Sequence, residues 1–206
     1  RARSLKVTAL SCDVTDEGSV NSLVDQVMER EGKLDVFVAN AGGSATTAHP
    51  PHGEIDEFRW TLEKNLTSTY ICAQAAGRVM IAQKSGSIIT LGSIASRLAS
   101  DPRIYNENFK RSGAPYMAAK AGVLVLTKAL AAEYSPHGVR VNCICPGQIP
   151  NDLTDKAQVE KFRTMNAFHR TGLAEDLKGA CALLASDAGK WITGTDILVD
   201  GGWSIW

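Results

Sequence analysis

The chain has 206 residues, with 22 Lys and Arg against 22 Asp and Glu, and its formal net charge is therefore zero. A neutral chain without a basic run lacks the charge distribution of a nucleic-acid-binding protein, and the apolar stretches are too short to span a bilayer. A hydrophobic content of 44% with 21% charged residues is ordinary for one globular domain with a packed core. We therefore expect a single domain over residues 1–206, with no nucleic-acid or membrane partner.

The cysteines favour a reducing compartment, because their number is odd and none forms a C-x-x-C pair. They are Cys12, Cys72, Cys143, Cys145 and Cys181. Cys143 and Cys145 stand two apart in an apolar run, which places both on one face of a strand, and we interpret them as small buried residues without a redox role. No apolar segment long enough for a signal peptide follows the N-terminal arginines. A cytoplasmic protein is expected.

Short apolar runs typical of strands alternate with helical patterns along the chain. Strands are expected at residues 5–10, 34–39, 87–91, 139–145 and 197–199. Helices are expected from Thr15 or Asp16 to Gly32 and over residues 55–83, 114–135 and 175–187. Strands that are apolar on both faces and alternate with helices form parallel sheets covered on both sides. The predicted fold is therefore a doubly wound α/β domain of the Rossmann type.

Small and polar residues follow the expected strands, at the sheet edge where such folds bind ligands. They are Asp13 and Val14, then Asn40, Ala41 and Gly42, then Ser93, and finally Pro146, Gly147 and Ile149. Glycine lets the backbone approach a flat ligand closely, and a carboxylate can accept a hydrogen bond from an exocyclic amine. Any one of these loops could simply be a turn. Four of them at one edge favour a ligand site.

Tyr116 and Lys120 are one helical turn apart and so share a helix face. A phenol has a pKa of about 10, which is too high for efficient proton exchange at neutral pH. A nearby ammonium favours the phenolate and lowers that pKa, so the pair could act as a general acid or base. Tyr105 is followed four places on by Phe109, which makes Tyr116 the better proton donor.

In their order along the chain, these residues resemble the classical branch of the short-chain dehydrogenase/reductase family, and the resemblance covers essentially the whole chain. The motifs that carry it are Asp13-Val14, Asn40-Ala41-Gly42, Asn65, Ser93, Tyr116-x-x-x-Lys120, Pro146-Gly147, Thr193-Gly194 and Val199-Asp200-Gly201-Gly202. The resemblance implies hydride transfer between NAD or NADP and a secondary alcohol or ketone. The long loop at residues 96–112 and the stretch 170–178 look most like gluconate 5-dehydrogenase-type reductases of sugar acids and polyols.

The resemblance also implies roles for individual residues. Tyr116 matches the acid/base, Lys120 the residue that binds the nicotinamide ribose and lowers the tyrosine pKa, Ser93 the residue that holds the substrate oxygen, and Asn65 the anchor of a water in a proton relay. Asp13 and Val14 would meet the adenine, Asn40, Ala41 and Gly42 would line the dinucleotide, and Pro146, Gly147 and Ile149 would meet the nicotinamide end. This division of labour is physically sensible, because the cofactor supplies the hydride and the protein supplies position and a proton donor.

The family's glycine-rich turn has no counterpart, since no glycine precedes Asp13. We therefore expect an N-terminally truncated domain that lacks its first strand-helix-strand-helix portion. Expressed alone, it should neither bind NAD(P) tightly nor reduce a ketone. The alternative is a catalytically silent fragment or family member that keeps the fold for assembly or binding.

The mostly polar loops at residues 44–54 and 96–112 predict a small polar hydroxy or keto substrate. A substrate carboxylate could pair with an arginine of the second loop, or these charges could simply face water. The candidates are Arg97, Arg103, Lys110 and Arg111. No metal is expected, because His49-Pro50-Pro51-His52 fits no common zinc spacing. By resemblance, we expect a homotetramer or homodimer in which the long helices from residues 55 and 114 pair across a two-fold axis.

Overall fold

The structure is a computed structural model that describes residues 6–44, 49–105 and 111–206. Four parallel strands form one sheet in the order β1-β2-β3-β4. They are β1 (Val36–Ala39), β2 (Gly86–Leu91), β3 (Val139–Pro146) and β4 (Asp196–Val199). The helices are α1 (Glu17–Glu31), α2 (Ile55–Leu62), α3 (Ser68–Gln83), α4 (Ala114–Tyr134), α5 (Lys156–Met165) and α6 (Lys178–Ala185).

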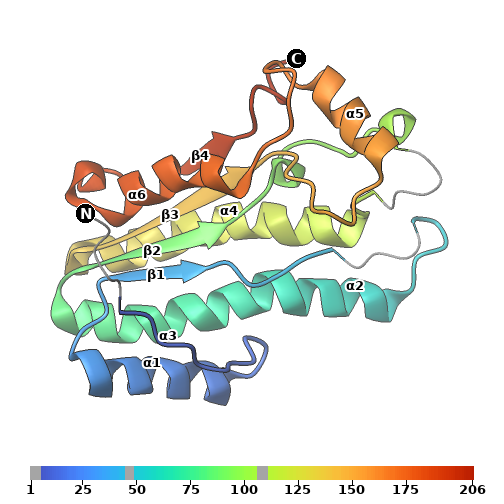
Figure 1. Cartoon of the computed structure of the whole chain (residues 1–206). Coiled ribbons are helices and arrows are strands. Elements are labelled where there is room, and N and C mark those ends of the chain that lie inside the picture. The colour runs from blue at the N-terminus through green and yellow to red at the C-terminus, as the bar shows by residue number, and fades with distance from the viewer. Residues whose placement is uncertain (1–5, 45–48, 106–110) are drawn as a thin grey trace.

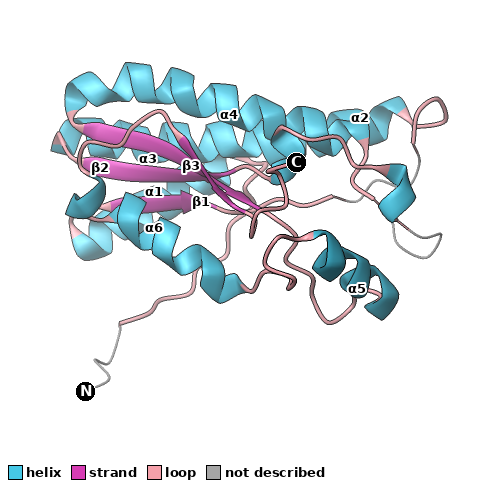
Figure 2. Ribbon diagram, turned by 90° about the horizontal axis from the view of Figure 1, so that it is seen from above, coloured by secondary structure: helices cyan, strands magenta, loops and turns pink. Residues whose placement is uncertain are grey.

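Helices cover both faces of the sheet, with α1, α3 and α4 on one face and α6 on the other (Figures 1 and 2). Successive residues of β2 point to opposite faces, as the strand period requires. Ile88 packs among residues of α3 and α4, whereas Ile89 packs with Leu184 of α6, and none of the three is exposed. This arrangement confirms the predicted doubly wound α/β fold.

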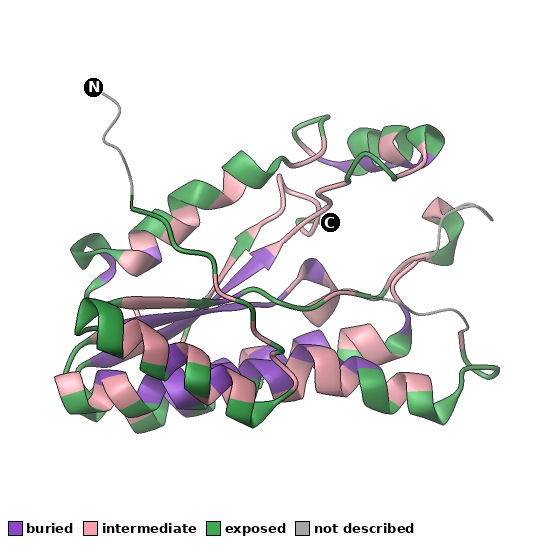
Figure 3. Ribbon diagram, turned by 60° about the horizontal axis from the view of Figure 1, so that its bottom comes forward, coloured by how far each residue is buried: buried purple, intermediate pink, exposed green. Residues whose placement is uncertain are grey.

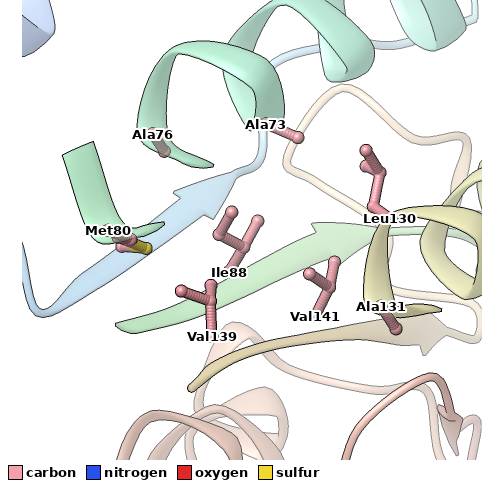
Figure 4. Close-up of a cluster of buried hydrophobic side chains, with 8 residues drawn as sticks. All are labelled: Ala73, Ala76, Met80, Ile88, Leu130, Ala131, Val139 and Val141. Carbon is pink, nitrogen blue, oxygen red and sulfur yellow. The ribbon is translucent and has the colours of Figure 1, made fainter. Parts of the chain in front are cut away.

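The largest part of the core lies between the sheet and the helices α3 and α4. Ala73 and Ala76 of α3 are small enough to bring that helix close to Ile88, and Met80 packs beside the start of β2 (Figure 4). Buried residues concentrate between the sheet and these helices, while the outer helix faces are exposed (Figure 3). Each large side chain buried here contributes about 1.5 to 3 kcal/mol of hydrophobic stabilisation.

The predicted helix at residues 16–32 is confirmed together with both of its end signals. Asp16 caps α1 by accepting a hydrogen bond from the Ser19 N–H at 2.8 Å, which satisfies one of the free amides of the first turn. Gly32 ends the helix with φ at 72°, a left-handed conformation that glycine adopts without strain. Val20 and Val24 are buried against β1 and α3. The helix therefore anchors the loop that precedes it to the sheet.

The helix expected over residues 55–83 is one continuous helical path with a π-helical turn, Glu63–Thr67, between α2 and α3. A π-helical turn inserts one extra residue into the helical ladder, and such turns are frequent at functional sites. Here it places Asn65 in the interior, fully buried.

The predicted strand at residues 5–10 is wrong. Residues 6–10 form no strand, and Val7 is 83% exposed. A strand is stable only beside a ladder partner, and none of the described residues provides one for this segment. The outer edge of β1 is likewise unpaired among the described residues, and Val38 is 43% exposed.

Two further segments near the C-terminus differ from expectation. Residues 156–165 form α5, a helix that the sequence analysis did not predict, and its N-terminus is capped by Asp155. The helix predicted at residues 175–187 is shorter: a 3₁₀ turn, Ala174–Leu177, precedes α6, which ends at Ala185. None of the helices within the described ranges is long and apolar enough to cross a membrane.

Candidate active site

Ser93 and Tyr116 meet at the carboxyl edge of the sheet. Ser93 follows β2 and begins a short 3₁₀ helix, Ile94–Ser96, in which its Oγ accepts a hydrogen bond from the Ala95 N–H at 3.1 Å. Tyr116 lies in the first turn of α4, and its phenol is hydrogen-bonded to the Ser93 side chain. A hydroxyl and a phenol from two different elements therefore converge on one point.

The pKa of Tyr116 moves in the direction opposite to the one expected from its spacing to Lys120. Burial raises the pKa of the phenol above its ordinary value of 10.0, and the hydrogen bond from Ser93 only partly offsets this effect. The Lys120 Nζ donates to the Leu91 carbonyl at 2.7 Å and lies 5.7 Å from the centroid of the Tyr116 ring. Because the ammonium is directed at Leu91, it does not stabilise the phenolate in this structure.

Lys120 is itself buried, and desolvation lowers its pKa. Its Nζ lies beside the loop after β1, since a Cβ added to Gly42 would be 3.7 Å from it. The amine is thus placed between the end of β2 and the loop that the sequence assigned to the dinucleotide.

Asn65 holds that loop in place. Its Nδ2 donates to the Thr61 carbonyl at 2.9 Å and to the Gly43 carbonyl at 3.0 Å, and its Oδ1 accepts from the Gly43 N–H at 2.9 Å. A Cβ added to Gly42 would lie 2.7 Å from Asn65 Oδ1, which is closer than real Cβ contacts allow. The observed function of Asn65 is therefore to fix the loop after β1, and its part in a water relay stays a prediction.

The loop after β3 forms the opposite wall of the site. Gly147 donates its N–H to the Val199 carbonyl at 3.0 Å, and a Cβ at Gly147 would be 2.6 Å from Asp200 Cα, so this close approach requires glycine. Beyond the loop opens a cavity of about 530 Å³. Its walls include Ser93 and Tyr116, then Gly147, Gln148 and Ile149, and on the far side Leu98, Ser100, Tyr105, Trp203 and Trp206.

The residues expected at the adenine end lie together elsewhere on the same edge. Val14, Asn40 and Ala41 line a hollow of about 150 Å³ beside α1 and α3. The carboxylate of Asp13 accepts hydrogen bonds from the Thr15 N–H at 2.9 Å and from the Thr15 hydroxyl at 2.7 Å, and these bonds lower its pKa. Of the predicted residues, four therefore line the large cavity and three line this hollow. The others line neither; they are Asp13, Gly42, Asn65, Lys120 and Pro146.

The structure does not support the expectation that a substrate carboxylate meets an arginine of the 96–112 loop. Arg97 pairs with Asp196, and Arg103 pairs with Asp101 at 2.7 Å. Neither arginine lines the cavity, whereas Asp101 does. Arg111 reaches the Ser100 carbonyl at 3.4 Å, and Lys110 lies outside the described residues.

Trp203 and Trp206 are cavity residues that the sequence analysis missed, whereas Gln148 belongs to the loop after β3 that was expected at the ligand edge. The two tryptophans follow Gly201 and Gly202, whose φ angles of 62° and 83° turn the chain back after β4. The sequence did contain a signal for this wall of the cavity, namely two tryptophans that follow a pair of glycines after the last strand.

The cysteine pair of β3 is buried, as predicted, with the sulfur atoms of Cys143 and Cys145 3.9 Å apart on one face of the strand. Within the described ranges, no three His, Cys, Asp or Glu side chains come together in a way that could hold a metal ion.

A parallel sheet with a Ser-Tyr-Lys set beside glycine loops at its carboxyl edge is the arrangement of a dinucleotide-dependent oxidoreductase. A family model described as enoyl-(acyl carrier protein) reductase matches residues 1–204. The chain belongs to the short-chain dehydrogenase/reductase family.

Similar proteins include a sorbose reductase of Candida albicans, 34% identical over 97% of this chain and 70% of that protein. An NADP-dependent mannitol dehydrogenase of Alternaria alternata is 35% identical over 98% of this chain and 73% of its own length. Among solved structures, a gluconate 5-dehydrogenase from Burkholderia cenocepacia in complex with NADP and tartrate is similar with a TM-score of 0.84 and 31% identity. That match covers 94% of this chain and 74% of the other.

Proposed function

We propose that this protein is an NAD(P)-dependent oxidoreductase that interconverts a secondary alcohol and a ketone of a small polyhydroxy compound. The observation that carries the proposal is the hydrogen-bonded pair of Ser93 and Tyr116 at the wall of a 530 Å³ cavity. A hydroxyl and a neutral phenol at one point are suited to bind a carbonyl oxygen and to supply its proton.

The residues present fit a dinucleotide. Gly42 has no room for a side chain beside Asn65, and this packing fixes the loop after β1 at the carboxyl edge of the sheet. The hollow lined by Val14 and Asn40 would take the adenine, and the backbone from Gly147 to Ile149 would meet the nicotinamide. Lys120 would bind the ribose. When bound, the cofactor supplies or accepts the hydride.

In the reduction, negative charge develops on the substrate oxygen as its carbon gains a hydride. The Ser93 hydroxyl donates a hydrogen bond to that oxygen, and the Tyr116 phenol donates its proton. Burial raises the pKa of the phenol above its ordinary value of 10.0, so at neutral pH the phenol carries the proton that the reduction requires. In alcohol oxidation the same oxygen atom of Tyr116 must first be deprotonated, and Asn65 would anchor the water through which that proton leaves.

The charges around the cavity favour a neutral polyol or ketose over a sugar acid. A substrate carboxylate would approach Asp101, while Arg97 and Arg103 are occupied by ion pairs. Two aspartates therefore neutralise two of the cationic side chains that were candidates for binding an acid, Arg97 and Arg103. The similarity to a sorbose reductase, a mannitol dehydrogenase and a D-threitol dehydrogenase supports the same class of substrate.

The test measures the oxidation of NADH and of NADPH by the purified protein in the presence of sorbose, fructose, a keto sugar acid or an apolar ketone. Turnover of a ketose that Tyr116→Phe abolishes is the expected result. Absence of turnover with every carbonyl compound and both cofactors would favour the alternative, a catalytically silent family member.

The proposal includes a homotetramer or homodimer in the cytoplasm. Exposed apolar side chains on the long helices support an assembly: Val125 of α4 is 68% exposed and Tyr70 of α3 is 46% exposed. Gly122 of α4 packs on Leu66 of the same chain and so lies outside this exposed surface. The five free cysteines support a reducing compartment. Sedimentation velocity at micromolar concentration tests the assembly, and a monomer would contradict it.

A further inference from the structure

The wall of the cavity is mixed, and one hydrogen-bonded polar pair on it stands among apolar side chains. Leu98, Ile104, Met165 and Trp203 contribute apolar surface, while Ser100, Asp101 and Ser112 contribute further polar groups. Among them stands the phenol of Tyr105, which is hydrogen-bonded to the side chains of Gln148 and Ser100. A polar group surrounded by apolar surface fixes the orientation and identity of a ligand.

Tyr105 is held rigidly from two sides. Its ring packs edge-on against Phe162 of α5, with centroids 5.9 Å apart, and Phe162 packs in the same way on Trp203 at 5.8 Å. Such aromatic pairs are directional contacts. The buried Gln158 of α5 donates from its Nε2 to the Ile104 carbonyl at 3.0 Å and so fixes the backbone beside Tyr105.

Gln148 lies between Tyr105 and the catalytic residues. It follows Gly147 in the loop that the proposed function places at the nicotinamide, and it lines the same cavity as Ser93 and Tyr116. A glutamine amide has two donor hydrogens and an acceptor oxygen, and a phenol can donate one hydrogen bond and accept others. The pair can therefore bond each other and still bond a ligand hydroxyl in the cavity.

We propose that Tyr105 and Gln148 bind a hydroxyl of the substrate and thereby select a polyhydroxy ketone over an apolar ketone. The inference rests on the proposed function and names the residues that give the site its substrate class. A ligand with a hydroxyl at this point completes the polar pair. A ligand without one displaces water and leaves the pair's remaining bonds unmade, which disfavours its binding.

The experiment compares the Tyr105→Phe and Gln148→Met variants with the wild-type protein, using sorbose and cyclohexanone as substrates. Both substitutions remove the polar group and keep most of the side-chain volume. Tyr70→Phe, on the exposed surface of α3, is the matched control. We expect kcat/KM for sorbose to fall about tenfold, the effect of losing a hydrogen bond or two. The loss should lie mainly in KM, with cyclohexanone turnover unchanged.

The double variant tests whether the two residues act as a unit. Because each substitution removes the same pair, the double variant should lose little more sorbose activity than either single variant. Equal loss on both substrates would mean that Tyr105 and Gln148 merely support the cavity, and no loss on either would mean that they do not touch the substrate. Either result overturns the inference but leaves the proposed function intact. A wild-type protein that reduces no carbonyl compound overturns the proposed function itself.

Discussion

Replacing Gly42 by alanine tests how the loop after β1 is packed against Asn65. The added Cβ would lie 2.7 Å from Asn65 Oδ1, and the φ of 154° at this position is one that side-chain-bearing residues rarely adopt. Asn65 is fully buried within the π-helical turn and cannot move into solvent. The collision must therefore displace either the loop or the amide.

The size of the effect follows from the bonds that the displacement breaks. Asn65 makes two hydrogen bonds with the backbone of Gly43, and their loss destabilises the protein by about 1 to 3 kcal/mol. Backbone strain at an unfavourable φ adds about 1 to 3 kcal/mol. The expected loss is therefore about 2 to 6 kcal/mol, a large share of the roughly 5 to 15 kcal/mol that stabilises a typical domain.

Two other glycines serve as controls in urea denaturation. Gly32 has φ at 72° with nothing within 4 Å of an added Cβ, so Gly32→Ala isolates backbone strain, about 1 to 2 kcal/mol. Gly18 lies in α1, where an added Cβ makes only ordinary contacts, so Gly18→Ala should be neutral or stabilise by roughly 0.5 to 1 kcal/mol. If Gly42→Ala destabilises no more than Gly32→Ala does, the contact with Asn65 has no energetic weight.

A double-mutant cycle gives a sharper test of the same contact. In an Asn65→Ala background the obstacle is gone, so adding Gly42→Ala should then destabilise the protein only by the backbone strain. An unchanged effect of Gly42→Ala in that background would refute the reasoning, because the loss of stability would then arise elsewhere.

Three further results are expected. Tyr116→Phe should abolish ketone reduction without changing the Kd for NADPH in calorimetry, since the ring remains, whereas Lys120→Ala should impair both turnover and binding. Ultraviolet titration of the cofactor-free protein and of its Tyr116→Phe variant gives the ionisation of Tyr116 by difference. This phenol should ionise above pH 10.0, because burial raises its pKa. Because the pKa of Tyr116 is higher in the folded protein than in the unfolded chain, the contribution of this phenol to stability is complete below pH 10.0. It is lost as the pH rises through the pKa of the folded protein. A titration midpoint of Tyr116 below pH 10.0 would show that the charge of Lys120 outweighs burial. The Kd for NADPH of the Lys120→Ala variant should exceed that of the Tyr116→Phe variant, and equal values would contradict a ribose contact for Lys120.

The elements that were predicted correctly are those whose signals are local. Asp16 and Gly32 mark the ends of α1 because capping and left-handed conformations depend on a few neighbouring residues. The apolar run at β2 predicted a strand buried on both faces, which Ile88 and Ile89 confirm. The resemblance to the short-chain dehydrogenase/reductase family assigned Ser93 and Tyr116 to one site, and the structure brings their side chains together.

What could not be predicted depends on partners far away in the sequence. The 5–10 segment has apolar composition, but composition does not supply a neighbouring strand. Arg97 was a plausible ligand for a substrate carboxylate until the structure paired it with Asp196, 99 residues further on. The π-helical turn around Asn65 could not be predicted either, because Asn65 is held there by two hydrogen bonds to the Gly43 backbone that only the folded loop provides.

The pKa of Tyr116 could not be predicted from its helical spacing to Lys120. The i, i+4 spacing correctly places Lys120 on the same face of α4, but the ammonium is bound to the Leu91 carbonyl and lies 5.7 Å from the centre of the ring. With the cation turned toward β2, burial and the Ser93 hydroxyl set the acidity of the phenol, and burial is the larger effect. Lowering that pKa therefore requires a positive charge nearer to the hydroxyl than Lys120 is in this structure. The protonated phenol is consequently the resting state of the site, and it is the form that a carbonyl reduction consumes.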